Sequence, residues 1–208
     1  MSGVEILGAI ASAIALVEGA SKFYTAIKDT NNLPQAFTEA GQRLPLIRAT
    51  LGTAEASVKK RSLDAAASKE VKTVIEACRQ KAERLHALLE QLVPKPDTSR
   101  FQRYRAAIRR LGRENMIEQL VKSMLEDVSL LASNRGVQTS TSAQVDEIKE
   151  AIAALAELPP SVPASRKSYA FTHTGSGHQF NNTGDGNQNN NHGSGNQYMA
   201  ECMNFGAV

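Results

Sequence analysis

The 208-residue chain has no tryptophan, only two cysteines and few aromatic side chains, which make up 5% of its residues. Two cysteines cannot build a disulfide framework, so we expect a reducing compartment. The cysteines and histidines also lack the spacing of a four-ligand zinc site, and we expect neither a metal nor another cofactor. A hydrophobic content of 41% still permits a core, which must be mainly aliphatic.

The sequence also lacks the motifs of common catalytic sites. No glycine-rich phosphate loop ends in Lys-Ser or Lys-Thr, and no G-x-S-x-G turn presents a serine nucleophile. His86 is the only histidine before residue 170, and we expect it at the edge of a leucine-rich core. We therefore expect a protein that is not an enzyme and has no small-molecule substrate.

Charge is distributed unevenly along the chain. Residues 1–167 contain all 24 Lys and Arg and 19 of the 21 Asp and Glu, which gives a net charge of +5. Residues 168–208 contain only two acidic side chains, Asp185 and Glu201, and have a net charge of −2. The two parts therefore require separate interpretations.

The first part shows helical periodicity and no strand-like alternation before residue 158. Residues 1–158 are expected to form an all-α domain, a bundle of four long helices and one short helix. A proline-rich linker over 159–173 follows it. Pro45 is expected to kink the second helix. The five helices are expected at about 2–28, 33–60, 63–93, 98–130 and 144–158.

The first helix is apolar on nearly every face, which is typical of a buried core helix or of a helix that enters a membrane. The apolar stretch covers residues 6–17, and Glu5 and Glu18 flank it. Twelve residues are too few for an ordinary transmembrane helix, which requires about 20. No basic segment typical of a secretory signal precedes the stretch. The candidate membrane-contacting residues are Ile6, Leu7, Ile10, Ile14, Leu16 and Val17.

Six arginines lie between residues 100 and 113, with Phe101 and Tyr104 among them. They are typical of a solvated helix face, of a surface that contacts anionic lipid, or of one that contacts nucleic-acid phosphates. Basic amphipathic helices adsorb to charged membranes. Nothing else in the chain matches a nucleic-acid-binding pattern, so nucleic acid is not an expected partner. The candidate lipid contacts are Arg103, Arg109, Arg110 and Arg113.

A nine-residue repeat occurs three times near the C-terminus, over residues 174–182, 183–191 and 192–200, and the C-terminal end follows at 201–208. The repeats share a G-x-G-x-Q frame at fixed spacing, which is the most specific pattern in the chain. The residues of this frame and of its neighbouring columns are Gly175, Gly177, Gln179, Phe180, Asn181, Gly184, Gly186, Gln188, Asn190, Gly193, Gly195, Gln197 and Tyr198.

Three interpretations of the repeats are open. Gly- and Asn-rich composition is typical of a disordered tail. Calcium-binding β-rolls also use nonapeptides, but they need an Asp and an aliphatic residue in every repeat, and Asp185 is the only Asp in these three. The third is cross-β stacking, because Asn and Gln form hydrogen-bonded ladders on rungs about 4.8 Å apart. We expect a tail that is disordered as a monomer and becomes cross-β, like a β-solenoid, on assembly.

Stacking with one repeat per rung explains how the tail tolerates its single Asp. Asp185 then lies between Ser176 and Ser194, and its next copy is three rungs, about 14 Å, away. This separation exceeds the Debye length of about 8 Å at physiological salt. One rung per molecule would place identical carboxylates about 5 Å apart, which is far less favourable.

Two segments together resemble known families. Residues 1–135, with the apolar first helix, K-D-T-N-N-L-P at 28–34 and L-P-L-I-R-A-T-L at 44–51, resemble the SesA-type domain at the N-terminus of fungal NACHT NTPases. They are also similar to HeLo-like helical death domains. The tail resembles the fungal sigma or pseudo-palindrome amyloid signalling motifs, which are RHIM-like and repeat N-x-G-x-G-x-Q cores, matched here at 184–188 and 193–197.

The resemblance implies a non-enzymatic effector of fungal innate immunity and heterokaryon incompatibility. A NACHT or NLR-type receptor with a matching motif would template the tail, which would self-assemble as a prion-like amyloid. Clustered helical domains would then release the first helix towards membrane lipid and cause programmed cell death. The chain would be cytoplasmic at rest and at the plasma membrane on activation. The alternative is an adaptor or scaffold whose helical domain binds a partner protein and does not touch membrane.

Overall fold

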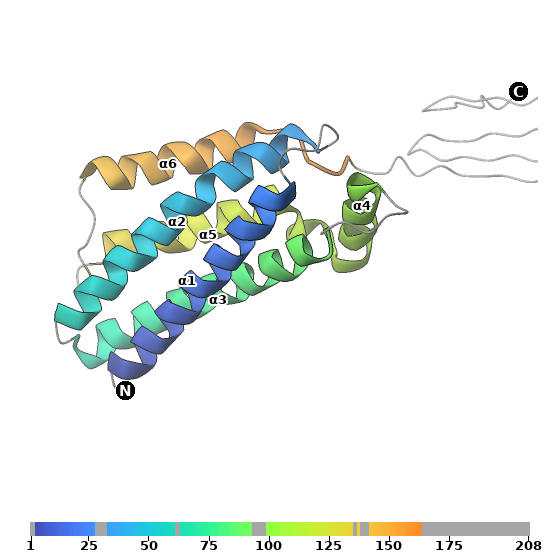
Figure 1. Ribbon diagram of the computed structural model, residues 1–208. Helices are drawn as coiled ribbons and strands as arrows, with labels where there is room; N and C mark the ends of the chain where they lie inside the picture. Colours follow the sequence, from blue (N-terminus) through green and yellow to red (C-terminus); the bar gives the residue numbers. More distant parts are fainter. Residues whose placement is uncertain are drawn as a thin grey trace, which may run out of the picture. The chain divides into compact units, whose positions relative to one another are not determined.

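The computed structural model describes residues 3–27, 33–60, 63–92, 99–134, 137 and 142–163. These residues contain helices and no strand, which confirms the all-α prediction for this part of the chain (Figure 1). The repeats at 174–200 lie outside the described residues, so their cross-β stacking stays a prediction. The elements are α1 (Gly3–Ile27), α2 (Gln35–Lys60), α3 (Ala65–Glu90), α4 (Arg100–Leu111), the 3-10 helix η1 (Arg113–Asn115), α5 (Ile117–Ser133) and α6 (Ser142–Glu157).

Four long helices form the body of the domain. α1 lies beside α2 and α3, and α5 lies beside the same two helices, which closes a four-helix ring (Figure 1). α6 packs on α5 and on the edge of α2, and α4 stands at one end of the bundle. The compact helical unit ends at Pro163, so it includes the first residues of the predicted linker.

The core is aliphatic, as the low aromatic content predicts. Each helix contributes one face at helical spacing, and the centre of the bundle consists of leucine, isoleucine, valine and alanine. Each fully buried leucine or isoleucine contributes about 1.5–3 kcal/mol relative to an exposed one. Three buried aromatic residues connect α1, α2 and α4: the Phe37 ring stacks 6.4 Å from the ring of Tyr24 and meets that of Tyr104 edge-on at 5.3 Å.

The prediction of one continuous helix over about 98–130 is wrong. α4 ends at Leu111, and Gly112 follows with φ 97°, a left-handed conformation that glycine adopts without steric cost. The Gly112 N–H still donates to the Ile108 carbonyl at 2.9 Å, which closes the last turn. The start also differs from the predicted Thr98, because the Ser99 side chain caps α4 by accepting from the N–H of Gln102.

Pro45 lies inside α2, and the helix continues on both sides of it. One turn earlier, α2 approaches α1 so closely that a Cβ added at Gly41 would overlap the Tyr24 ring. The buried ring cannot withdraw without disturbing its stacking on Phe37. A glycine is therefore required at position 41 for packing, although it is costly inside a helix.

We expect Gly41→Ala to lower the free energy of unfolding by about 1–3 kcal/mol, because the extra methyl group overpacks the α1–α2 contact. Gly52→Ala is the matched control, since it lies in the same helix and its Cβ would meet no atom within 4 Å. This control should raise stability by up to about 1 kcal/mol through helix propensity. Urea denaturation followed by circular dichroism measures both. Equal effects of the two variants would contradict the close approach.

Candidate functional site

α1 presents two different faces. Ile6, Ile10 and Val17, three of the six candidate membrane residues, are buried in the bundle. The other three, Leu7, Ile14 and Leu16, are half-buried and pack against the rim of the core. The outward face adds Val4, which is 75% exposed, and the exposed small residues Gly8, Ala11, Ser12 and Ala15.

The length and composition of α1 would allow it to cross a membrane. It has 25 residues, or about 37 Å of helix, and its most apolar stretch of 18 residues is 28% buried. The core helix of a water-soluble protein passes the same test. The sequence-based expectation that the apolar stretch is too short to span a membrane is therefore wrong as to length, because the apolar surface of α1 continues beyond Glu18.

Two ion pairs attach α1 to its neighbours. The Glu5 carboxylate lies 3.1 Å from the Lys72 ammonium of α3, and the Glu18 carboxylate lies 2.5 Å from the Arg48 guanidinium of α2. All four side chains are partly exposed, so solvent screens both pairs and each contributes little stability. α1 is held mainly by its buried apolar face.

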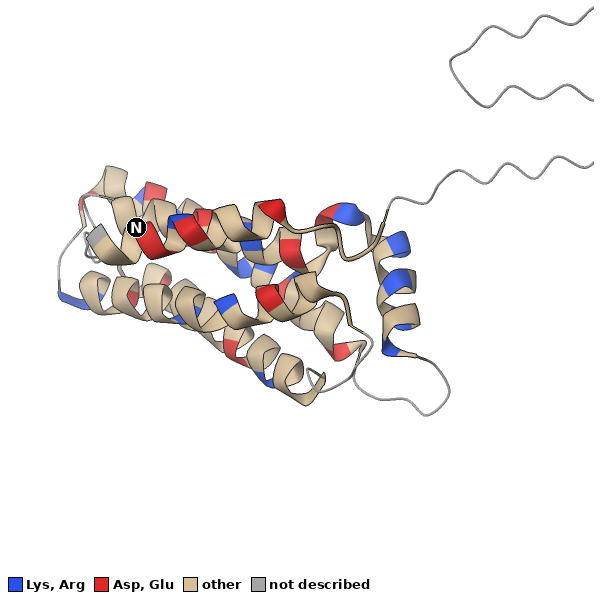
Figure 2. Ribbon diagram, turned by 90° about the horizontal axis from the view of Figure 1, so that it is seen from above, with Lys and Arg blue, Asp and Glu red and all other residues tan. Residues whose placement is uncertain are grey.

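Basic residues recur along α4 (Figure 2), and the arginines of α4 and η1 divide into two groups by their contacts. Two candidate lipid contacts bind backbone carbonyls of the domain: Arg103 donates to the Leu92 carbonyl at 3.2 Å, and Arg113 donates to the Val162 carbonyl at 3.3 Å. Arg110 is exposed and donates to Gln91 at 2.9 Å, and Arg109 is exposed on the same helix. The structure therefore leaves Arg109 and Arg110 better placed than Arg103 and Arg113 to meet an external anion.

A buried polar cluster joins α4, α5 and the segment after α6. The Tyr104 hydroxyl lies 2.6 Å from the Ser161 hydroxyl and accepts the Ile117 N–H at 3.1 Å. The Ser161 N–H and hydroxyl both donate to the Glu118 carboxylate, at 2.7–2.9 Å. Burial, together with the nearby Glu118, raises the pKa of Tyr104, so the phenol stays protonated. This cluster could not be predicted from the sequence, because Ser161 lies in a proline-rich segment that is expected to be a linker.

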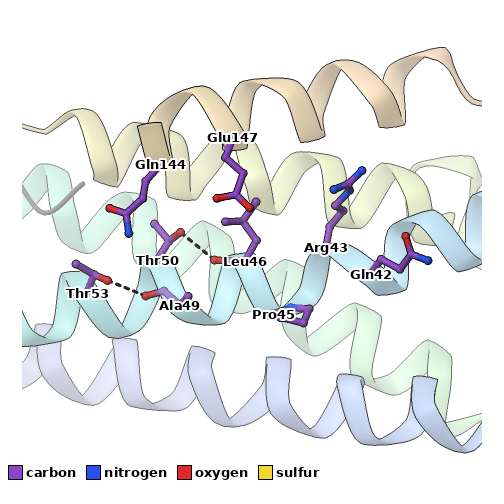
Figure 3. Close-up of a pocket in the computed structure, with 9 residues that line it drawn as sticks. All are labelled: Gln42, Arg43, Pro45, Leu46, Ala49, Thr50, Thr53, Gln144 and Glu147. Atoms are coloured by element: carbon purple, nitrogen blue, oxygen red, sulfur yellow. Dashed lines mark hydrogen bonds between the residues drawn. The ribbon is translucent and has the colours of Figure 1, made fainter. Parts of the chain in front are cut away.

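A surface pocket of about 350 Å³ lies along the seam between α2 and α6 (Figure 3). The hydroxyls of Thr50 and Thr53 donate to carbonyls of α2 itself, at 2.9 Å. The charged lining residues are Arg43 from α2 and Glu147 from α6, which have opposite sign. Nothing in this arrangement selects a ligand, and we assign none.

A family model described as the N-terminal domain on NACHT NTPases and P-loop NTPases, SesA, matches residues 10–131. The chain belongs to the SesA family. A second model, the sigma domain on NACHT-NTPases, matches residues 168–206, which include the three nonapeptide repeats. No match was found among curated proteins or solved structures. The two family matches identify the chain as a NACHT-associated signalling effector and confirm the resemblance to a SesA domain with a sigma motif.

The SesA match covers most of α1 and all of α2, α3 and α4, and ends within α5. α6 and residues 158–163 therefore lie between the SesA match and the sigma match. This part of the chain contains Ser161 and Val162, both buried against the SesA helices. Residues 158–163 are thus part of the helical domain.

Other titratable groups of the SesA domain have structural roles. The Lys81 ammonium lies 2.6 Å from the Asp127 carboxylate and joins α3 to α5. Burial raises the pKa of Asp127, although Lys81 opposes this shift. Burial also raises the pKa of the Cys78 thiol to about 12, which leaves it unreactive. His86 is half-buried and meets the Phe23 ring edge-on at 5.0 Å, at the edge of the core as expected.

Proposed function

We propose that this SesA protein is a non-enzymatic effector of a NACHT or NLR-type receptor. The receptor templates the sigma segment into a cross-β amyloid, which clusters the helical domains. The clustered domains then move from the cytoplasm to the plasma membrane, and their action there leads to regulated cell death. The observation that carries this proposal is the presence of the SesA and sigma matches on one chain.

The composition of the repeats supports the amyloid step. The tail from residue 168 onwards contains no Lys, no Arg and no Pro, and it repeats its Gln column at 179, 188 and 197. Low charge, absence of proline and repeated Gln and Asn favour stacked ladders. Binding to a preformed template avoids the nucleation step, so a clustered receptor would act as a seed.

The surface of α1 supports the membrane step. Its outward face has exposed apolar and small residues and is flanked by exposed ion pairs of low strength. A single weak anchor binds membrane reversibly, whereas many anchors on one assembly bind together. Arg109 and Arg110 add positive charge on the exposed side of α4, which favours anionic lipid.

We expect residues 168–208 alone to form fibrils, and residues 1–163 alone to remain helical and unassembled. The helical unit ends at Pro163, so this cut preserves the contacts of Ser161 and Val162. Thioflavin T binding and a meridional fibre reflection at about 4.8 Å measure the assembly. A tail that stays monomeric even when seeded would contradict the amyloid step.

Leakage of liposomes that contain anionic lipid separates the proposal from the adaptor alternative. Protein seeded through its tail should release an encapsulated dye, and Arg109→Gln with Arg110→Gln should weaken the release. The matched control is Lys69→Gln with Arg84→Gln, which removes two exposed charges from α3. If seeded, folded protein leaves the vesicles sealed at every concentration, the adaptor role is the better description.

A further inference from the structure

We propose that residues 161–163 form a latch that holds α4 against the start of α5 in the unassembled protein, and that the assembling tail pulls this latch open. The inference rests on the proposed function, because the tail is the segment that pulls. It adds a mechanical coupling between the sigma segment and the helical domain. The latch belongs to neither family match, since it lies between residues 131 and 168.

Hydrogen bonds of the latch form a directed chain. Glu118 is a carboxylate and only accepts, so the Ser161 hydroxyl hydrogen points to it. The Tyr104 hydroxyl must then donate to the Ser161 oxygen, and its own oxygen accepts the Ile117 N–H. Without Ser161, the Tyr104 hydroxyl loses its acceptor and the Glu118 carboxylate loses these donors, whereas the Ile117 N–H keeps the Tyr104 oxygen as its acceptor. Removing Ser161 leaves buried groups unsatisfied on two helices.

The latch also connects α4 to the rest of the domain. Tyr104 is fully buried and contacts the Phe37 ring of α2, the start of α5 and Ser161. Val162 is buried as well, and its carbonyl accepts from Arg113, which follows α4. α4 itself has only 12 residues, and three of them are buried. Loss of the latch therefore loosens the helix that carries the exposed arginines.

The Glu118 carboxylate makes the latch weak enough to open. Glu118 is 2% exposed, and its described donors are the neutral N–H and hydroxyl of Ser161. Burying a carboxylate costs free energy that neutral donors offset only in part. Its position in the first turn of α5 supplies some compensation through the helix dipole. Opening returns the carboxylate to water, which offsets part of the lost hydrogen bonding.

Crowding of the helical domains along the fibril provides the force that opens the latch. With three rungs per molecule, successive chains lie about 14 Å apart along the fibril. A ring of four helices is about 20 Å wide, since each helix with its side chains is about 10 Å across. Domains of this width do not fit in one row at this spacing, so we expect each domain to pull on the residues that join it to its rungs. Opening the latch adds residues 161–163 to the connection between the helical domain and the repeats, which lengthens it by about 10 Å at about 3.3 Å per extended residue.

Hydrogen exchange on the full chain tests the latch. In the unassembled protein, NMR follows the amides of Ile117 and Ser161, which report the two ends of the hydrogen-bond chain. In the tail-seeded assembly, mass spectrometry follows peptides over 100–120 and 158–163. On assembly, we expect exchange in these peptides to become faster by about tenfold or more. Peptides from the centre of α3 should stay protected. Thioflavin T confirms in the same sample that the tail has assembled.

Ser161→Ala should show the fast exchange before any seeding. The two reporter amides keep their acceptors, but Tyr104 loses its own acceptor and Glu118 loses one donor, so the segment opens more often. Ser57→Ala is the matched control: it also deletes one hydroxyl hydrogen bond, a 2.6 Å contact to the Val137 carbonyl, at a site remote in sequence from the latch. It should leave the two reporter amides protected. Equal behaviour of the two variants overturns the latch.

The two failures can be told apart. Assembled tails with unchanged exchange at Ile117 and Ser161 would overturn the latch and leave the proposed function standing. Tails that do not assemble even when seeded would overturn the proposed function, and the tail-driven latch with it. Fast exchange on assembly in the wild type, together with early exchange only in Ser161→Ala, supports the latch.

Discussion

Lysines at Ala11 and Ala15 are expected to abolish liposome leakage by the seeded protein while the helical bundle stays folded. Both alanines lie on the exposed face of α1, so the substitutions remove no core contact. Lysine is nearly as good a helix former as alanine, which keeps α1 intact. Each lysine at the centre of a bilayer costs about 2.5–3.5 kcal/mol on insertion scales, so two of them oppose entry of this helix strongly. Dye release from vesicles with anionic lipid is the measurement.

Ala153→Lys with Ala156→Lys is the matched control for this experiment. It places the same two charges on an exposed face of α6, which the membrane step does not use. The control should leak like the wild type, and both variants should keep the wild-type circular dichroism and thioflavin T signals. Lysine at Ile10 would be a poorer choice, because this side chain is fully buried and its replacement would unfold the bundle. Leakage by the α1 variant at the wild-type rate would exclude this face from the membrane step.

Replacing Gln179, Gln188 and Gln197 by Lys is expected to prevent assembly of the tail. In the stacked arrangement these residues occupy one column, so identical positive charges would lie on adjacent rungs about 4.8 Å apart. Repulsion at this distance is not screened by physiological salt, whose Debye length is about 8 Å. Sedimentation and thioflavin T binding, with and without wild-type seeds, measure the loss.

The control for the tail carries three Gln→Lys changes in the helical domain. Gln42, Gln102 and Gln119 are exposed there, so their replacement shifts the net charge equally without charging the repeats. This variant should assemble like the wild type. Asp185→Asn should assemble at least as fast, because it removes the one charge of the three repeats. Normal fibrils from the tail variant would exclude the Gln column.

The all-α class and the two-part organisation were predictable from the sequence. Helical spacing of apolar residues is a local property, and it correctly indicated where most of α1, α2, α3 and α6 lie. The repeated G-x-G-x-Q frame is also local, and the sigma match covers the segment that carries it. The break between α4 and α5 was not predicted, because apolar residues continue on both sides of Gly112, at Ile108, Leu111, Met116 and Ile117. The chain ends α4 there because Gly112 adopts a positive φ.

The sequence by itself determined that α1 is apolar and that the tail repeats, because both are patterns of neighbouring residues. Only the tertiary structure decided which face of α1 is buried, since that depends on where α2 and α3 pack against it. The same holds for the contact between Glu118 and Ser161, which are separated by 43 residues. No local pattern links these two residues. α6 packs on α5, and the segment that follows α6 then places Ser161 beside Tyr104 and Glu118. Buried polar groups require hydrogen-bond partners, and here the partners come from distant parts of the chain that only folding brings together.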